Sequence, residues 1–213
     1  YLIDPETTHS STHDNKMSTL HVTKTAKPRE GRAEQMYNAR NHARLVAGGI
    51  VLDDALDKVL MISSSKHRDR WILPKGGIEY DEKENFAITA LRETWEEAGA
   101  VGAVTKKLPV VEDARDPAER AQMEDIPLCE FHFYQMKLVE LDTDWPEASN
   151  RLRRWCTYQE AKHELLKSKR PELFSALNDS DIVKDHVEIL QYDEHSNTLL
   201  DTQLDNDNGY ENL

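Results

Sequence analysis

The sequence is poor in the features that mark secreted and membrane proteins. Its 213 residues include only two cysteines, Cys129 and Cys156, which form no metal-binding spacing. No apolar run approaches the roughly 20 residues that a membrane-spanning helix needs. The chain begins at Tyr1, and no charged segment followed by an apolar one resembles a secretory leader. We therefore expect buried thiols rather than a disulfide, no membrane partner, and a cytoplasmic or nuclear location.

Basic residues are outnumbered by acidic ones, and they are unevenly distributed. The chain has 27 lysines and arginines against 40 acidic residues, for a formal net charge of −13. Residues 16–44 nevertheless contain seven basic residues and two acidic ones, whereas residues 179–213 contain ten acidic residues and one lysine. The basic segment either binds a local anion, forms a basic linker, or pairs with the acidic tail.

Composition divides the chain into three parts. Residues 1–24 are polar and are interpreted as a disordered or vector-derived tail, residues 25–178 as one folded domain, and residues 179–213 as an acidic, mostly disordered tail. We find no internal repeat, and we expect a monomer.

The folded part alternates between strand and helix patterns. Apolar, β-branched runs predict strands at 44–53 and 58–63, joined as a hairpin. Further strands are expected at 101–111, 128–138 and 151–155, an insertion loop at 112–127, and helices at 158–169 and 171–177. These elements indicate an α/β or α+β sandwich.

A longer helix is expected at residues 82–98. Apolar residues recur there at three- and four-residue steps, Asp81 with Glu84 resembles an N-cap pair, and Gly99 is a natural C-terminal stop. Glu93, Glu96 and Glu97 fall at i, i+3 and i+4, so their carboxylates share one face.

This carboxylate face has two interpretations. Acidic helix faces are often merely solvated, but three crowded carboxylates also suit a hard divalent cation. Pro74, Gly76 and Gly77 precede the helix and let the backbone approach a ligand. The combination favours a metal-bound phosphate site.

The stretch from Gly76 to Ala100 resembles the Nudix box, which runs G, five residues, E, seven residues, then R-E-apolar-x-E-E-x-G-apolar. Glu84 lies at the box spacing from Arg92, while the glycine pair sits two positions early, which implies a longer loop before the helix. Thr94 and Ala100 occupy the two apolar slots.

The resemblance implies an α/β/α sandwich with a mixed central sheet and a metal-dependent hydrolase. It implies Mg²⁺, with Mn²⁺ or another divalent cation as substitutes. Glu93 and Glu97 correspond to metal ligands, Glu96 to the general base, and Arg92 to a residue that orients a neighbouring carboxylate.

A closer resemblance covers roughly residues 25–178. The runs ARLVAGGIVL, VLMISSSKHRDRWILPKGG, RETWEEAGA, EFHFY and KRPELFSAL are similar to the fungal diadenosine and diphosphoinositol polyphosphate phosphohydrolases. This implies cleavage of phosphoanhydride bonds in diphosphoinositol polyphosphates, in diadenosine polyphosphates and in inorganic polyphosphate.

The same resemblance implies a set of substrate-binding residues: Arg32, Arg44, Ser64, Ser65, Lys66, Lys75, Gly76, Gly77, Arg151 and Arg170. The expected partner is a highly anionic small molecule, which a protein of this net charge can bind only through a concentrated basic pocket. We expect no specific nucleic acid, although charge alone does not separate such a ligand from RNA or polyphosphate.

Two other functions remain open. A nucleotide-sugar, ADP-ribose or mRNA-cap Nudix hydrolase would need aromatic side chains to stack on a base, and the candidates are Trp71, Trp95, Trp145 and Tyr158. A non-catalytic module that binds inositol pyrophosphates would usually lack some box carboxylates. His132 is interpreted as a hydrogen-bonded strand residue without a catalytic role.

Overall fold

The computed structural model describes residues 20–118, 127–185, 192–193, 198–199 and 210–211. The longer strands are β1 (Arg44–Leu52), β2 (Lys58–Ser63), β5 (Ala100–Lys107), β7 (Cys129–Leu141) and β8 (Arg153–Thr157). The short ones are β3 (Trp71–Ile72), β4 (Lys75–Gly77), β6 (Val111–Glu112), β9 (Tyr192–Asp193), β10 (Thr198–Leu199) and β11 (Tyr210–Glu211). The helices are α2 (Phe86–Ala98), α4 (Tyr158–Lys167), α5 (Pro171–Asn178) and the 3₁₀ turn η1 (Tyr80–Glu82).

One mixed sheet organises the domain. Its strand order is β11-β8-β2-β1-β7-β5, with β3, β4 and β6 paired to β2, β1 and β7. Strand β1 runs parallel to β7 along its whole length and antiparallel to β2 and β4. The predicted hairpin is confirmed, and the central strands are continuous apolar runs because helices cover both of their faces.

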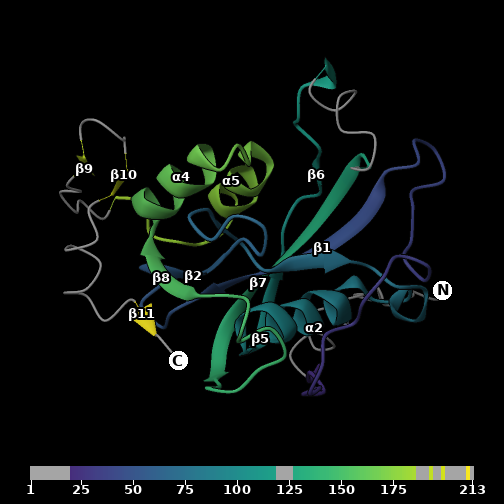
Figure 1. Ribbon diagram of the computed structural model, residues 1–213, viewed down its shortest axis with the longest axis horizontal. Helices are drawn as coiled ribbons and strands as arrows, with labels where there is room; N and C mark the ends of the chain where they lie inside the picture. Colours follow the sequence, from purple (N-terminus) through teal and green to yellow (C-terminus); the bar gives the residue numbers. More distant parts are fainter. Residues whose placement is uncertain (1–19, 119–126, 186–191, 194–197, 200–209, 212–213) are drawn as a thin grey trace, which may run out of the picture.

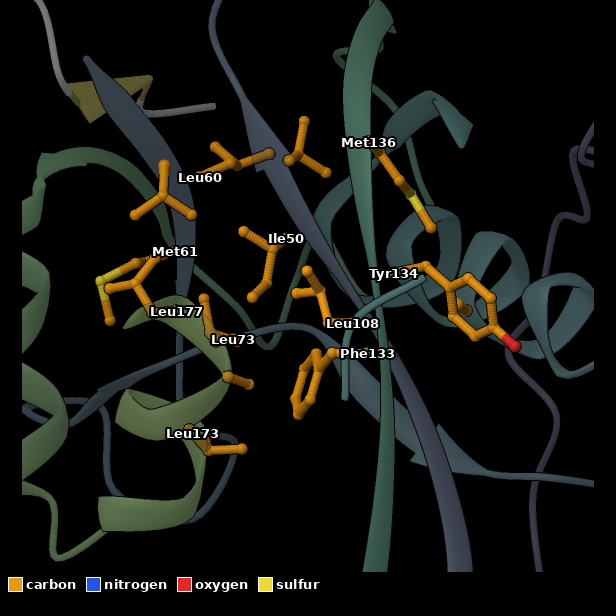
Figure 2. Packing of buried hydrophobic residues seen from close by; sticks show 14 of the residues in the cluster. Ile50, Leu60, Met61, Leu73, Leu108, Phe133, Tyr134, Met136, Leu173 and Leu177 are labelled. Atoms are coloured by element: carbon orange, nitrogen blue, oxygen red, sulfur yellow. The ribbon is translucent and has the colours of Figure 1, made fainter. Parts of the chain in front are cut away.

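Three layers result from this arrangement. Figure 1 shows α2 on one side of the sheet and α4 with α5 on the other. On the α5 side, Leu173 and Leu177 face the sheet residues Met61 and Phe133, as Figure 2 shows. The predicted α/β/α sandwich with a mixed sheet is therefore confirmed. Among the described residues, no helix has the length and apolar content that would be needed to cross a bilayer.

The start of α2 differs from the prediction. The helix begins at Phe86, and its N-cap is Asn85, whose side chain accepts a hydrogen bond from the Ala87 N–H. Asp81 lies in the separate turn η1, so the predicted Asp81 cap and start at residue 82 are wrong. Extended backbone at Asn85 together with its amide oxygen makes it the better cap. Gly99 ends the helix in the left-handed region (φ 61°), as predicted.

The later elements largely follow the predictions. Strands β7 and β8 and helices α4 and α5 lie within a few residues of the expected ranges. The single strand expected at 101–111 is instead β5 and β6, which pair with different stretches of β7. Cys129 and Cys156 are free thiols, as expected, but only Cys156 is fully buried and Cys129 is half-buried. His132 bonds Glu130 through its Nε2 at 2.8 Å, in keeping with a structural role.

Packing extends past both expected domain boundaries. Leu20 and Val22 pack against the core from the N-terminal side. Beyond residue 178, Ile182 is buried and the Val183 N–H donates to the Leu56 carbonyl. Strand β11 pairs with β8. The disorder expected for residues 1–19 and for most of 186–213 lies outside the described residues.

Candidate active site

The carboxylate face of α2 points into the protein and not into solvent. Glu93, Glu96 and Glu97 are all buried, Glu96 to 2% exposure. The solvated-face interpretation is therefore wrong. A buried carboxylate is costly unless it is bonded or paired, so the partners of these three groups indicate what the site is built to hold.

Strand β4 lies against these carboxylates. The Lys75 N–H donates to Glu97 Oε2 at 2.8 Å. A Cβ at Gly76 would collide with the Glu93 carboxylate, and one at Gly77 would collide with the Gln35 side chain. Both predicted glycines thus lie in close contacts, and at Gly76 the group packed on the backbone is a predicted metal ligand.

Arg92 holds the cluster together. Its Nη1 donates to Glu93 Oε1 at 2.7 Å and to Glu96 Oε2 at 3.2 Å, its Nε donates to Glu82 Oε1 at 2.7 Å, and its Nη2 donates to the Gly77 carbonyl. Burial alone would raise the pKa of Glu82, but hydrogen bonds from Arg92 and Thr89 outweigh it and keep that pKa below the usual value. Arg92 therefore orients two of the three carboxylates, as predicted.

This network corrects the assignment of the first box glutamate. Glu82 is buried and bonds Arg92, whereas Glu84 is exposed. Glu82 also lies six positions after Gly76, so the glycine-to-glutamate spacing of the box is regular. The two extra residues lie between Glu82 and Arg92, where the chain leaves η1 and enters α2, and the expected lengthening of the glycine loop is wrong.

The electrostatics of Glu93 and Glu97 suit a cation. Burial and the neighbouring Glu97 carboxylate raise the pKa of Glu93 to about 8, against the opposing effect of Arg92. Burial also raises the pKa of Glu97, against Arg151 and Lys75. Two acidic groups whose ionisation is penalised in the protein would be stabilised by a divalent ion.

Among the described residues, no three His, Cys, Asp or Glu side chains form a ready-made metal cage. The carboxylates are held by arginines and backbone N–H groups, and Glu96 Oε1 is buried without a hydrogen-bond partner in the described part of the chain. Glu93 and Glu97 nevertheless fit a hard cation, because burial still penalises their ionised forms in spite of these partners and their donors are oxygen atoms.

Arg151 links the third carboxylate to a cleft. It donates through Nη2 to Glu97 Oε1, through Nε to Glu147, and through Nη1 to the Ser63 carbonyl. The cleft has a volume of about 730 Å³ and is lined by Lys27, Pro28, Arg29, Glu30, Ser65, Pro146, Glu147, Asn150 and Arg151. Two predicted substrate residues, Ser65 and Arg151, therefore meet at one cleft beside the carboxylates.

Lys75 and Arg170 form a second cationic group next to Glu97. Burial lowers the pKa of the Lys75 ammonium to about 8; Arg170 and Arg151 act in the same direction, and Glu97 opposes them. Arg170 is about one third exposed and lies 3.3 Å from the buried Glu172 carboxylate. These cations lie close enough to repel one another, which an anionic ligand would relieve.

The other predicted substrate residues lie around these two groups. Arg44 donates to Gln35 Oε1 at 2.6 Å, and the Gln35 N–H bonds the carbonyl of the exposed Arg32. The half-buried Ser64 accepts a bond from the His67 N–H, while Lys66 is exposed beside Ser65. Arg44 and the Arg32 carbonyl thus contact Gln35, which packs against Gly77, and neither residue lines the cleft.

The sequence prediction missed three residues at the site. Glu82 could have been found by counting forward from Gly76. Lys27 and Arg29 lie in the basic segment that was noticed, but no pattern connected them to Glu96. The Arg29 N–H donates to Glu96 Oε2 at 3.2 Å.

Comparisons with known proteins agree with this geometry. Residues 42–177 match the family described as NUDIX domain. The chain therefore belongs to the Nudix family. It is 36% identical to human diphosphoinositol polyphosphate phosphohydrolase 3-alpha over 107 residues, which are 49% of this chain and 58% of that protein. It is also 36% identical to Arabidopsis thaliana Nudix hydrolase 12, mitochondrial, over 149 residues, which are 62% of this chain and 70% of that protein.

The chain thus spans less than two thirds of the human relative. Among solved structures, a NUDIX hydrolase from Nitrosomonas europaea superposes with a TM-score of 0.53 at 15% identity, covering 64% of this chain and 87% of that one. This likeness supports the fold alone.

Proposed function

We propose that this protein is a metal-dependent pyrophosphohydrolase that cleaves the phosphoanhydride bonds of diphosphoinositol polyphosphates, and also of diadenosine polyphosphates and inorganic polyphosphate. The observation that carries the proposal is the cluster of three buried α2 carboxylates next to two groups of cations, one that lines the cleft and one formed by Lys75 and Arg170. A ligand that fits the cations must carry several phosphates, and one that fits the carboxylates must bind a metal ion at its diphosphate.

Each residue has a defined task in this proposal. Glu93 and Glu97 would hold Mg²⁺ (or Mn²⁺), which when bound would neutralise charge on the diphosphate. Glu96 accepts the proton of the attacking water, and Arg92 keeps Glu96 and Glu93 in place. Lys75 and Arg170 bind phosphate oxygens next to the bond that breaks, by charge-assisted hydrogen bonds.

The spread of the cations supports an inositol ring over a linear substrate. Lys27, Arg29 and Arg151 line the cleft, while Lys75 and Arg170 form a second group near Glu97. A ring that presents phosphates in several directions can contact both groups at once. The name of the human relative points to the same substrate class.

The first alternative is a nucleotide-sugar, ADP-ribose or cap hydrolase, and the aromatic residues argue against it. Trp71, Trp95, Trp145 and Tyr158 are all buried. Trp71 and Trp145 stack on Arg154 and Arg153, and Trp95 bonds the Thr25 carbonyl. None of the four is free to stack on a base.

The second alternative is a non-catalytic module that binds inositol pyrophosphates. Such a module has no need for three buried carboxylates whose ionisation costs free energy. The bonded Arg92 network and the unpartnered Glu96 Oε1 favour catalysis.

The test is phosphate release from a diphosphoinositol polyphosphate, from a diadenosine polyphosphate and from polyphosphate, with and without Mg²⁺. Glu96→Gln is expected to bind substrate normally but to lower kcat by about 100-fold or more, as for loss of a general base. Glu93→Gln and Glu97→Gln are expected to lower metal affinity and activity together. Glu84→Gln, an exposed neighbour, is the matched control and should behave as wild type.

Metal-independent release, or wild-type turnover by Glu96→Gln, would contradict the proposal. Hydrolysis confined to nucleotide sugars would favour the first alternative. Tight binding of the inositol substrate without any hydrolysis would favour the second.

A further inference from the structure

Residues 20–30 cross the outer side of α2 as a strap. Leu20 and Val22 pack against the core. Lys24 bonds Glu140 and Asp142, at 2.7 and 2.9 Å, and lies over the Trp95 ring. The indole N–H of Trp95 donates to the Thr25 carbonyl at 3.1 Å. The strap precedes the part of the chain that matches the family.

The strap ends at the predicted general base. The Arg29 N–H and Arg92 Nη1 both donate to Glu96 Oε2, each at 3.2 Å. The other oxygen, Oε1, is buried and has no partner among the described residues. Two donors on one oxygen fix the plane of the carboxylate and leave the second oxygen able to accept a proton.

The Arg29 side chain holds this N–H in place. Its Nη1 bonds Glu79 at 2.5 Å and Asp81 at 3.1 Å, both at the turn η1 in front of α2. Pro28 restricts the backbone immediately before Arg29. The contact with Glu96 is therefore anchored at two points: by Trp95 and Lys24 on one side, and by η1 on the other.

We infer that the strap is a positioning element of the active site, in which the backbone N–H of Arg29 orients Glu96 for its task. The inference rests on the proposed function for its catalytic consequence, but not for the contact itself. A strap with a merely structural role would affect the stability of the domain and nothing specific to Glu96.

The contact can be tested without substrate. Hydrogen exchange at the Arg29 amide, followed by NMR, should accelerate about ten-fold or more in Glu96→Ala, because the acceptor is lost. Glu84→Ala is the control and should leave that amide protected. Equal exchange in both variants and in wild type would overturn the inference, whether or not the protein hydrolyses any phosphate.

The catalytic consequence is tested by Arg29→Pro against Arg29→Ala. Both remove the bonds to Glu79 and Asp81, but only proline removes the N–H. We expect kcat to be at least about ten-fold lower in Arg29→Pro than in Arg29→Ala, with similar KM. In a Glu96→Gln background the two variants should have equal kcat, because the group that is positioned has lost its function.

Melting temperatures identify an Arg29→Pro protein that fails to fold. In that event Trp95→Phe, which removes the indole donor to Thr25, is the second test. It should lower kcat several-fold in the wild-type background and not in Glu96→Gln. An equal loss of kcat in both backgrounds, in either test, would show that the strap acts only on stability.

Discussion

The three carboxylates of α2 have different partners, so they are not interchangeable. Among the described residues, Glu93 is bonded by Arg92, while Glu97 is bonded by Arg151 and by the Lys75 N–H. Glu96 accepts hydrogen bonds from Arg92, which also bonds Glu93, and from the backbone N–H of Arg29 in the strap. The two predicted metal ligands therefore lie beside Arg151 and Lys75, whereas the predicted base is held by Arg92 and by the strap.

Lys75 should make substrate binding depend on pH. Because burial lowers its pKa to about 8, the ammonium of the free protein loses its proton as the pH rises through that value, and a neutral amine attracts phosphate weakly. We expect KM to rise above pH 8 at saturating Mg²⁺ and constant ionic strength. Lys75→Arg keeps its charge and should show a flat KM from pH 7 to 9.5. An identical rise in both proteins would assign the effect to another group.

Arg151 and Arg170 should differ in their effects. Arg170→Ala is expected to lower kcat/KM for a diphosphoinositol substrate by about ten-fold or more and to affect a diadenosine polyphosphate less, since a linear ligand reaches fewer cations. Arg151→Ala should harm both substrates alike, because Arg151 is bonded to Glu97. The measurement is the ratio of the two kcat/KM values in each variant. An unchanged ratio in Arg170→Ala would indicate a general polyphosphate groove.

Spacing along one helix explains which site residues were predictable. Glu93, Glu96 and Glu97 share a face by helical geometry alone, and the glycine pair signals close approach of a backbone. Glu82 was missed because the spacing was counted back from Arg92 across the segment that carries the extra residues. The bonds of Arg151 to Glu97 and Ser63 join residues 54 and 88 positions apart, and no local pattern encodes them.

At the scale of elements, the site is the contact between β4 and α2. Strand β4 is only three residues long, and it holds its place by pairing with β1, where Ala47 lies opposite Gly76. This brings the backbone of Gly76 against Glu93 and the N–H of Lys75 to Glu97. The strand thus supplies both a donor and the space that the carboxylates need.

The two glycines of β4 provide a matched pair of substitutions. Gly76→Ala places a methyl group into the Glu93 carboxylate and should lower kcat by about 100-fold. Gly77→Ala meets the flexible end of Gln35 and should leave most of the activity, although the bond from Arg44 to Gln35 is disturbed. Steady-state kinetics of both variants measure the loss of kcat, and melting curves show whether either variant is destabilised. If Gly77→Ala proved the more damaging, the role given to Gly76 would be wrong.

Helices and strands were predicted correctly where the element is long enough for its apolar periodicity to be recognised. Strands β1, β2 and β7 and helices α4 and α5 carry clear apolar patterns, and each was expected. Strands β3 and β4 have two and three residues, which is too short for any period. The start of α2 was misplaced because Asp81 and Asn85 are both good capping residues, and only the turn η1 decides between them.

At the scale of the whole molecule, a chain of formal net charge −13 would have to bind the proposed polyanionic substrate in spite of the repulsion between like charges. The cations that could do this are drawn from the strap, β4, the segment before β8 and the segment before α5. They converge only in the folded chain. Such concentrated charge attracts anions locally even when the overall charge repels them.

The last prediction concerns the C-terminal segment. Packing continues beyond α5: Ser180 Oγ bonds the Leu177 carbonyl, Asp181 bonds Lys106 and Gln135, and Ile182 is buried. Removing residues 179–213 should therefore cost roughly 2–5 kcal/mol, most of it from the buried isoleucine. For a chain of this size that corresponds to a fall in Tm of about 5–15 °C.

Removing only residues 186–213 keeps these contacts and takes away the short pairing of β11 with β8, so the fall in Tm should be much smaller. Ile182→Ala in the full-length chain is the matched point substitution and should reproduce most of the larger loss. Activity at a temperature where all the proteins are folded should be unaffected, because the described residues 179–185 bond Lys106, Gln135 and Leu56 and do not line the cleft. Equal melting temperatures for the two truncations would show that residues 179–185 do not stabilise the domain, which would then end at residue 178 as the sequence pattern predicts.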